Sequence, residues 1–429
     1  MLQISLPRAL LSSSHCPSLA GLGSLLVVLL LLSSTGFGQV KVRTLDQSPF
    51  EARVLGIDSS TLSYKSGAAS PQSVELSRLV SLTFDEKPIR IPSSRSGLLQ
   101  FDIAGGDRLY GEIIDSNDDE VRVSTQALGP VSIAYEHLSR VLVLRNLRGR
   151  ESQLVGSADQ ERDLLFVESR DSVDRVVGDL GRFKKGGVDF QWNEQGESPF
   201  DFKADKVLAI CLSDVEPPAR PKGVYAVAWF QDGSRLTGAI RVASNGAFSM
   251  QFGVGKNLTL KPEALQQLSF RGGDFVYLSD LKLPIVKETP YLEGGLTYGL
   301  SLDRGLGGAP VSVGRVFFEK ALAVHSRTHL TYRVPKGYDY FACAVGIDES
   351  VAKRSVKGAV TFRVRKGGGG DGVLIGKAVT RRAGEPAVWL EKIAVKPAEL
   401  LVLEADFADR AHFNGWAVWG SPMFWKTRR

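Results

Sequence analysis

The stretch that decides the fold is LAVHSRTHLTYRVPKGYDYFACAVGID, residues 322–348. From His329 to Val334 polar and apolar residues alternate, which is the period of a half-buried strand. Pro335-Lys336-Gly337 predicts a tight turn, because proline presets one backbone dihedral and glycine tolerates the next. Tyr340 to Ile347 is typical of a second strand. The stretch therefore predicts a β-hairpin.

Further alternating runs follow this stretch at spacings of 10 to 15 residues. They are AVTFRVRK (359–366), VLIGKAVTRR (373–382), PAVWLEKIAV (386–395) and AELLVLEADF (398–407). Antiparallel strands at this spacing are typical of a β-sandwich. The C-terminal third of the chain is therefore predicted to be one.

The order of residues in this third resembles the NPCBM-type family of carbohydrate-binding domains. The resemblance covers about residues 274–425 and rests on several motifs together: VYLSDL (276–281), His325-Ser326, Leu330-Thr331-Tyr332, Tyr338, Val345-Gly346-Ile347-Asp348, TFRV (361–364) and Trp416-Ala417. It implies a jelly-roll sandwich of the galactose-binding-like type. Such domains often carry a structural calcium, which is implied by the resemblance only, since no Asp-rich loop demands one.

Upstream, residues 39–272 contain an internal repeat. Its clearest copies are DRLYGEIIDSNDDEVRV (107–123) and SRLTGAIRVASNGAFSM (234–250). Equivalent positions hold Ala52, Gly111, Gly178 and Gly238, which are 59, 67 and 60 residues apart. About five short strands per unit predict small β-barrels, and the unit resembles an Sm-like or SH3-like barrel. A bent antiparallel meander is the alternative, because glycine also permits sharp curvature there.

These patterns divide the chain into a series of segments and predict an all-β protein. Proline-rich polar linkers at 88–96 and 215–222 act as extended spacers. The predicted segments are an export signal at 1–38, β-repeats at 39–87, 97–146, 147–214 and 223–272, and the NPCBM-like sandwich at 274–429.

The N-terminus predicts export. LLVVLLLL (25–32) is an unbroken apolar run, and Gly36 and Gly38 are small residues suited to cleavage after Gly38. The run is shorter than the ~20 residues that a membrane span needs, although an uncleaved anchor stays the alternative. We expect a secreted, periplasmic or cell-envelope protein that spans no membrane after cleavage. Cys211 and Cys343 lie in different predicted domains, so we expect two buried, unpaired thiols.

No catalytic constellation emerges from the motifs. The HExxH and GxSxG patterns are absent, and the glycine run at 367–370 lacks the Lys-Ser/Thr end of a phosphate cradle. The chain is therefore predicted to be no enzyme, with no metal site and no cofactor. Residues 321–429 carry 18 Lys+Arg against 10 Asp+Glu, which is a net charge of +8. The whole chain has a net charge of +6, so residues 1–320 carry −2. That balance and export argue against nucleic acid as a partner.

A sugar site needs an aromatic ring for the C–H face and polar groups for the hydroxyls. The last segment holds four of the six tryptophans. The candidate carbohydrate-binding residues are Tyr298, His325, Arg327, Asp348, Asp406, Asn414, Trp416 and Trp419. Each of three candidates has a structural alternative. Trp416 packs in the core, His325 is buried with its imidazole hydrogen-bonded, and Asp348 caps a turn.

The leading hypothesis is an exported, non-catalytic protein. Its C-terminal sandwich binds carbohydrate or cell-envelope polysaccharide, and its β-repeats serve as a spacer or interaction array. The alternative is a structural or adhesion protein of the cell envelope that binds protein partners. An accessory part of a glycoside hydrolase ranks lower, because the repeats leave no room for a large catalytic barrel.

Overall fold

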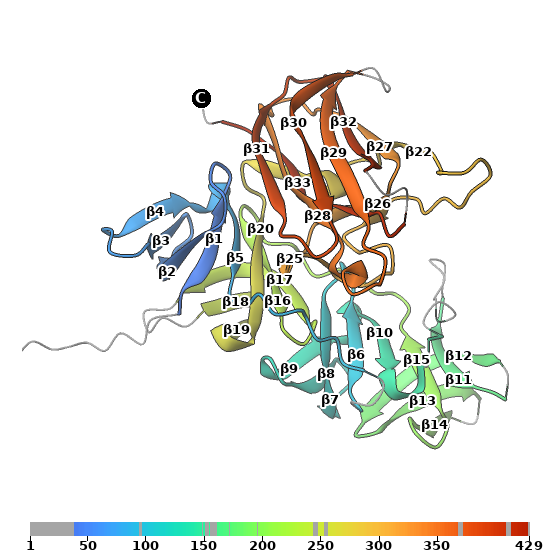
Figure 1. Ribbon diagram of the computed structural model, residues 1–429. Coiled ribbons are helices and arrows are strands. Elements are labelled where there is room, and N and C mark those ends of the chain that lie inside the picture. The colour runs from blue at the N-terminus through green and yellow to red at the C-terminus, as the bar shows by residue number, and fades with distance from the viewer. Residues whose placement is uncertain are drawn as a thin grey trace, which may run out of the picture. The chain divides into compact units, whose positions relative to one another are not determined.

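The structure is a computed structural model. It describes residues 38–93, 97–147, 149–150, 154, 161–170, 172–194, 196–242, 248–252, 256–367, 372–408 and 413–427. The predicted export signal lies outside the described residues except for Gly38, as do the last three glycines of the 367–370 run. Strands dominate the described chain, which confirms the all-β prediction (Figure 1).

Four successive units share one strand order. In the first, β1 (Val40–Thr44), β2 (Phe50–Ile57), β3 (Thr61–Lys65) and β4 (Gln72–Glu75) pair in sequence as an antiparallel meander. The 3₁₀ turn η1 (Leu76–Arg78) then leads to β5 (Leu79–Thr83), which returns to pair with β1.

The other three units repeat this meander and its returning fifth strand. Their strands are β6 (Leu99–Ile103), β7 (Arg108–Ser116), β8 (Glu120–Thr125), β9 (Gly129–Ala134) and β10 (Leu138–Val143); β11 (Asp163–Glu168), β12 (Val173–Lys184), β13 (Gly187–Asn193), β14 (Gly196–Asp201) and β15 (Val207–Cys211); and β16 (Tyr225–Phe230), β17 (Arg235–Val242), β18 (Phe248–Phe252), β19 (Lys256–Leu260) and β20 (Leu265–Arg271).

Short helical pieces join some of these strands. They are η2 (Tyr135–His137), α1 (Leu144–Leu147) and η4 (Pro262–Ala264). No closed barrel is found in the part of the chain that the structure describes, so the units are five-stranded meanders. The predicted segment boundaries themselves stay a prediction.

The recurring glycine of these units has a steric cause. A Cβ built on Gly111, Gly178 or Gly238 would lie closer than 3.0 Å to a carbonyl oxygen of the neighbouring third strand, and real Cβ atoms essentially never come that close. In the second, third and fourth units the second strand therefore passes so close to its neighbour that only glycine fits, whereas Ala52 holds the equivalent position in the first unit.

Strand pairing also joins the units to one another. β10 pairs with β15, which links the second unit to the third. β5 pairs with β20, which links the first unit to the fourth rather than to the second. In a linear array each unit contacts only its sequence neighbours, so this pairing departs from that pattern.

The C-terminal segment is a sandwich of two antiparallel sheets (Figure 1). The six-stranded sheet has the order β23 (Ser301–Leu302), β26 (Ala321–His325), β33 (Trp416–Trp425), β28 (Tyr340–Ile347) and β31 (Val388–Ala394), with β21 (Phe275–Tyr277) also on β33. The five-stranded sheet has the order β22 (Ile285–Glu288), β27 (Thr328–Arg333), β32 (Leu400–Phe407), β29 (Ala359–Lys366) and β30 (Val373–Arg382). Two 3₁₀ turns, η5 (Leu278–Asp280) and η6 (Glu349–Val351), complete the segment.

The predicted β-hairpin of residues 322–348 is wrong, although both of its strands exist. β27 pairs with β22 and β32 in one sheet, whereas β28 pairs with β31 and β33 in the other. The Pro335-Lys336-Gly337 turn therefore crosses from sheet to sheet. Leu330, Tyr332 and Val334 do share the buried face, as the alternation predicts.

A small hairpin covers part of the outer face of the six-stranded sheet. It consists of β24 (Val311–Val313) and β25 (Val316–Phe318). A Cβ on Gly346 of β28 would clash with Val313, and a Cβ on Gly420 of β33 would clash with Phe318. These two glycines make room for the hairpin's side chains.

Two further expectations concern the cysteines and the membrane. Cys211 and Cys343 are both buried, and neither forms a disulfide, as expected. Within the described ranges, none of the helices has the length and apolar composition that a bilayer span needs.

Candidate functional site

The candidate residues gather at one end of the sandwich, where β26, β28 and β32 finish and β27 and β33 begin. His325, the last residue of β26, lies directly opposite Trp416, the first residue of β33. The Ser326 amide donates to the Gly415 carbonyl at 3.0 Å, and the Asp348 amide donates to the Trp416 carbonyl at 3.0 Å. Three neighbouring strands are thus tied together at this loop end.

Tyr298 supplies the exposed aromatic ring of the loop end. The backbone amides of Tyr298 and Gly299 donate to the two carboxylate oxygens of Glu288, at 2.8 and 2.9 Å. The tyrosine ring stacks on His325 with a centroid distance of 4.3 Å and an interplanar angle of 14°. Tyr298 is 47% exposed whereas His325 is 4% exposed, so the imidazole supports the ring from beneath.

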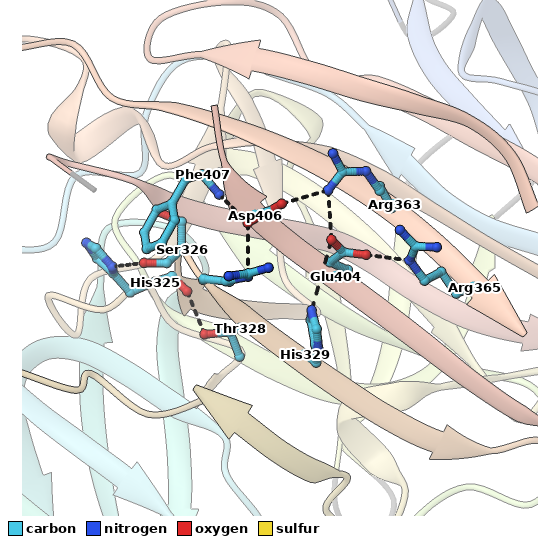
Figure 2. Close-up of polar contacts among 10 residues, drawn as sticks. His325, Ser326, Thr328, His329, Arg363, Arg365, Glu404, Asp406 and Phe407 are labelled. Atoms are coloured by element: carbon cyan, nitrogen blue, oxygen red, sulfur yellow. Dashed lines mark hydrogen bonds and ion pairs between the residues drawn. The ribbon is translucent and has the colours of Figure 1, made fainter. Parts of the chain in front are cut away.

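His325 is itself fixed by its neighbours. Its Nδ1 lies 2.5 Å from the Ser326 carbonyl oxygen, and its own carbonyl accepts from the Thr328 hydroxyl at 2.6 Å (Figure 2). The buried imidazole is thus held in place beneath the Tyr298 ring.

Arg327 and Asp406 supply charged groups at the same loop end, next to the start of β27 and the end of β32. Arg327 Nε lies 3.3 Å from Asp406 Oδ1. Arg363 Nη1 donates to Asp406 Oδ2 at 2.9 Å (Figure 2). The Arg327 side chain is largely exposed, and the Asp406 carboxylate is mostly covered. Two guanidinium groups thus hold the carboxylate at the surface as a fixed acceptor.

The Asp406 carboxylate rests on a charged network on the outer face of the five-stranded sheet. Glu404, which is buried, accepts from Arg363 Nη1 at 2.7 Å and from Arg365 Nε at 2.6 Å. His329 Nε2 lies 4.0 Å from Glu404 Oε1. Burial lowers the pKa of His329 below its usual value, with Arg327 and Lys287 acting in the same direction.

Trp416 is half-buried and has a different set of neighbours. The Arg354 guanidinium carbon lies 4.8 Å from its ring centroid. Arg354 Nη1 also donates to Asn414 Oδ1 at 2.7 Å, and Asn414 Nδ2 donates to the Val356 carbonyl at 2.7 Å. Asn414 therefore holds the arginine that covers the indole, and part of the Trp416 ring stays accessible.

Two candidates do not face solvent. Asp348 is 3% exposed and caps η6 by accepting from the Ser350 amide at 2.9 Å, which is the capping alternative. Burial raises its pKa. Trp419 has no exposed surface and packs edge-on against Phe362 at 5.2 Å between the sheets. A sealed indole cannot stack on a sugar, so Trp419 is corrected to a core residue.

The structure adds loop-end residues that sequence reasoning missed. Tyr291 is exposed and makes an edge contact with Phe407 at 5.3 Å. Tyr291 lies in the same Pro- and Gly-rich loop as Tyr298, so an aromatic residue in a polar loop was the signal. Arg354 had no such signal, because its contact with Trp416 depends on the fold.

No group of three or more His, Cys, Asp or Glu side chains placed to hold a metal ion is found among the residues that the structure describes.

A scan against family models matches residues 275–425 to the NPCBM/NEW2 domain. Residues 275–425 form an NPCBM/NEW2 domain. This match confirms the resemblance inferred from the motifs. A search of curated proteins found no match.

Solved structures similar to the chain include carbohydrate-binding modules. One is CBM51-2 with INT domains from Clostridium perfringens ZmpB, in complex with GlcNAc, at 22% identity and TM-score 0.31 over 44% of this chain and 38% of that one. Another is CBM51 from Clostridium perfringens GH95 with methyl-galactose, at 18% identity and TM-score 0.30 over 35% of this chain and 99% of that one.

A third is the tandem CBM51 modules of a family 98 glycoside hydrolase from Streptococcus pneumoniae, at 14% identity and TM-score 0.29 over 62% of this chain and 88% of that one. The chain spans about 38% of the length of the first of these structures. These TM-scores are too low to support an argument, and the assignment of the NPCBM domain rests on the family model.

Proposed function

We propose that the chain is an exported, non-catalytic protein that binds carbohydrate at the loop end of its NPCBM domain. The observation that carries the proposal is the exposed ring of Tyr298, stacked on buried His325, which lies directly opposite Trp416 on the neighbouring strand. Membership of residues 275–425 in a carbohydrate-binding module family supports it.

The chemistry of this loop end suits a sugar. An aromatic ring covers the apolar C–H face of a pyranose, while charged hydrogen-bonding groups bind its hydroxyls. Tyr298 and the exposed part of Trp416 supply the rings. Arg327 supplies donors and Asp406 supplies acceptors beside them. Asp348, as a buried cap, and Trp419, as a core residue, take no part.

Glycan binding by the full chain tests the proposal. Native protein, Tyr298→Ala, Trp416→Ala and Trp192→Ala are compared on a glycan array and by affinity electrophoresis in polysaccharide gels. Loss of a stacking ring weakens binding about tenfold. Trp192 is an exposed indole on β13, outside the NPCBM domain, so it is the matched control and its loss leaves binding unchanged.

Tyr298→Phe separates the ring from the hydroxyl. The substitution keeps the face that stacks on the sugar, so most of the affinity remains if stacking dominates. Absence of binding to every glycan by correctly folded native protein contradicts the proposal, as does equal weakening by Trp192→Ala.

One observation favours a protein partner as the second candidate function. β22 lies at the edge of the five-stranded sheet, and Ile285 on this strand is 73% exposed. Leu292 and Leu296 in the following loop are exposed as well. An exposed apolar edge strand is a template for pairing with another chain. Ile285→Lys discriminates, because it abolishes capture of an envelope protein and leaves glycan binding intact.

A further inference from the structure

A second concave site lies away from the loop end, beside Trp389 on β31. It is a cavity of about 200 Å³. Its walls come from β1, β5 and β20 of the first and fourth units, from the β24–β25 hairpin and from β31. None of the candidate residues of the loop end lines it. The cavity is therefore a separate site.

Arg43 is the unusual group in this cavity. It is 4% exposed, and its guanidinium carbon lies 4.1 Å from the centroid of the Trp389 ring. Among the described residues no carboxylate lies within ion-pair distance of it, and the nearby Glu391 carboxylate accepts from the Ser48 hydroxyl at 2.6 Å instead. A buried cation is costly without a paired anion.

Arg43 is charged in the neutral pH range. Burial lowers its pKa to about 10, which still lies well above neutral pH. At neutral pH the cavity therefore presents a permanent positive charge.

The rest of the lining does not neutralise this charge. The lining contains three cationic side chains, Lys41, Arg43 and Arg315, against one carboxylate, Glu86, which gives +3 − 1 = +2. Lys41 and Glu86 pair with each other at the surface. The charge that remains on Arg43 and Arg315 favours an anionic ligand.

Aromatic and neutral polar groups complete the walls. The Trp389 ring is half-buried, and Phe317 also lines the cavity. Gln267 is 8% exposed, and its Nε2 makes only a long hydrogen bond of 3.4 Å to the Thr83 hydroxyl. Its Oε1 has no hydrogen-bond partner in the described parts of the chain. A ligand that carries hydroxyl groups would satisfy this amide.

The volume limits the size of the ligand. At ~30 Å³ per water molecule in the liquid, the cavity has room for about six or seven waters. A single six-membered sugar ring with its substituents fits this space.

We propose that this cavity binds one carboxylate-bearing sugar residue, a hexuronate. Its carboxylate pairs with Arg43, its apolar ring face lies against the part of the Trp389 side chain that Arg43 leaves uncovered, and a hydroxyl bonds to the Gln267 amide. The proposal does not depend on glycan binding at the loop end.

Ligand-observed NMR and titration calorimetry on the full chain test it with D-glucuronate, D-glucose and acetate as probes. Glucuronate binds at least tenfold more tightly than glucose, because glucose lacks the charge, and more tightly than acetate, because acetate lacks the ring. Equal affinity for glucose overturns the anionic site. Equal affinity for acetate overturns the sugar assignment.

Variants locate the binding. Arg43→Gln weakens glucuronate binding about tenfold or more, whereas Arg182→Gln, at an exposed arginine on β12, leaves it unchanged. If Arg43→Gln fails to fold, Gln267→Leu serves instead, with an expected loss of about threefold. Unchanged affinity in either folded variant overturns the proposal. Folded Arg43→Gln keeps its binding to loop-end glycans, so the failure of one site is distinguishable from that of the other.

Discussion

Replacing Gly346 by alanine tests how the β24–β25 hairpin is seated on the sandwich. A Cβ at this position would lie closer than 3.0 Å to Val313 Cγ1, whereas carbon atoms in contact lie about 3.5–4.0 Å apart. The backbone at Gly346 does not need a positive φ, so strain of that kind plays no part. The hairpin or β28 must therefore move by at least ~0.5 Å.

The expected cost follows from overpacking and from the compensating change. Forcing a methyl into a packed site costs about 1–3 kcal/mol, so we expect Gly346→Ala to lose ~2 kcal/mol of unfolding free energy. Val313→Ala removes two buried methyl groups, at about 0.8 kcal/mol each. In the double variant the smaller residue at 313 makes room for the new methyl. The combined loss is therefore at least ~1 kcal/mol smaller than the sum of the single losses.

Urea unfolding followed by tryptophan fluorescence measures the four free energies of this cycle. Gly56→Ala on β2 is the matched control, because a Cβ there meets nothing within 4 Å, and it leaves stability unchanged or slightly raised. Additive losses for the two substitutions, or a Gly346→Ala variant as stable as the native chain, would refute the steric reasoning.

Three other predictions concern charges and thiols. Glu404→Gln lowers the unfolding free energy by ~2 kcal/mol, because it removes the anion that pairs with two partly buried arginines, Arg363 and Arg365. The control, Asp118→Asn, breaks an exposed ion pair and has no measurable effect in the same urea titration. The folded-state pKa of His329 lies below its ordinary 6.5, so as the pH falls the unfolded chain binds the proton before the folded chain does. The unfolding free energy therefore falls as the pH drops below 6.5. His329→Gln flattens that part of the curve of stability against pH, and an unchanged curve contradicts the assignment. Cys343 and Cys211 are buried, and burial raises the pKa of the Cys343 thiol, so a thiol reagent labels neither residue until the chain is denatured; labelling of the native protein would contradict this placement.

The repeats could be predicted from sequence because their decisive feature is local. Gly111, Gly178 and Gly238 lie where a neighbouring carbonyl leaves no space for a side chain. The glycine spacing in the sequence therefore marks this position of each of these three units. The alternation at Leu330, Tyr332 and Val334 likewise records which face of the strand is buried.

Strand partners and side-chain exposure could not be predicted in the same way. A turn such as Pro335-Lys336-Gly337 joins strands within one sheet or across two, and nothing local decides between them. Trp416 and Trp419 are three residues apart on one strand, hence on opposite faces, and only the position of the second sheet decides which indole is sealed. The site is therefore recognisable by residue type but separable from the core only by the fold.

During translation, β5 is synthesised long before its partner strand β20. Leu82 aligns with Leu268, so 186 residues (268 − 82) must be added before β5 meets its partner. At about 5–20 residues per second, translation takes roughly 10–40 s to cover that distance. During those seconds the first unit carries an open strand edge on the nascent chain.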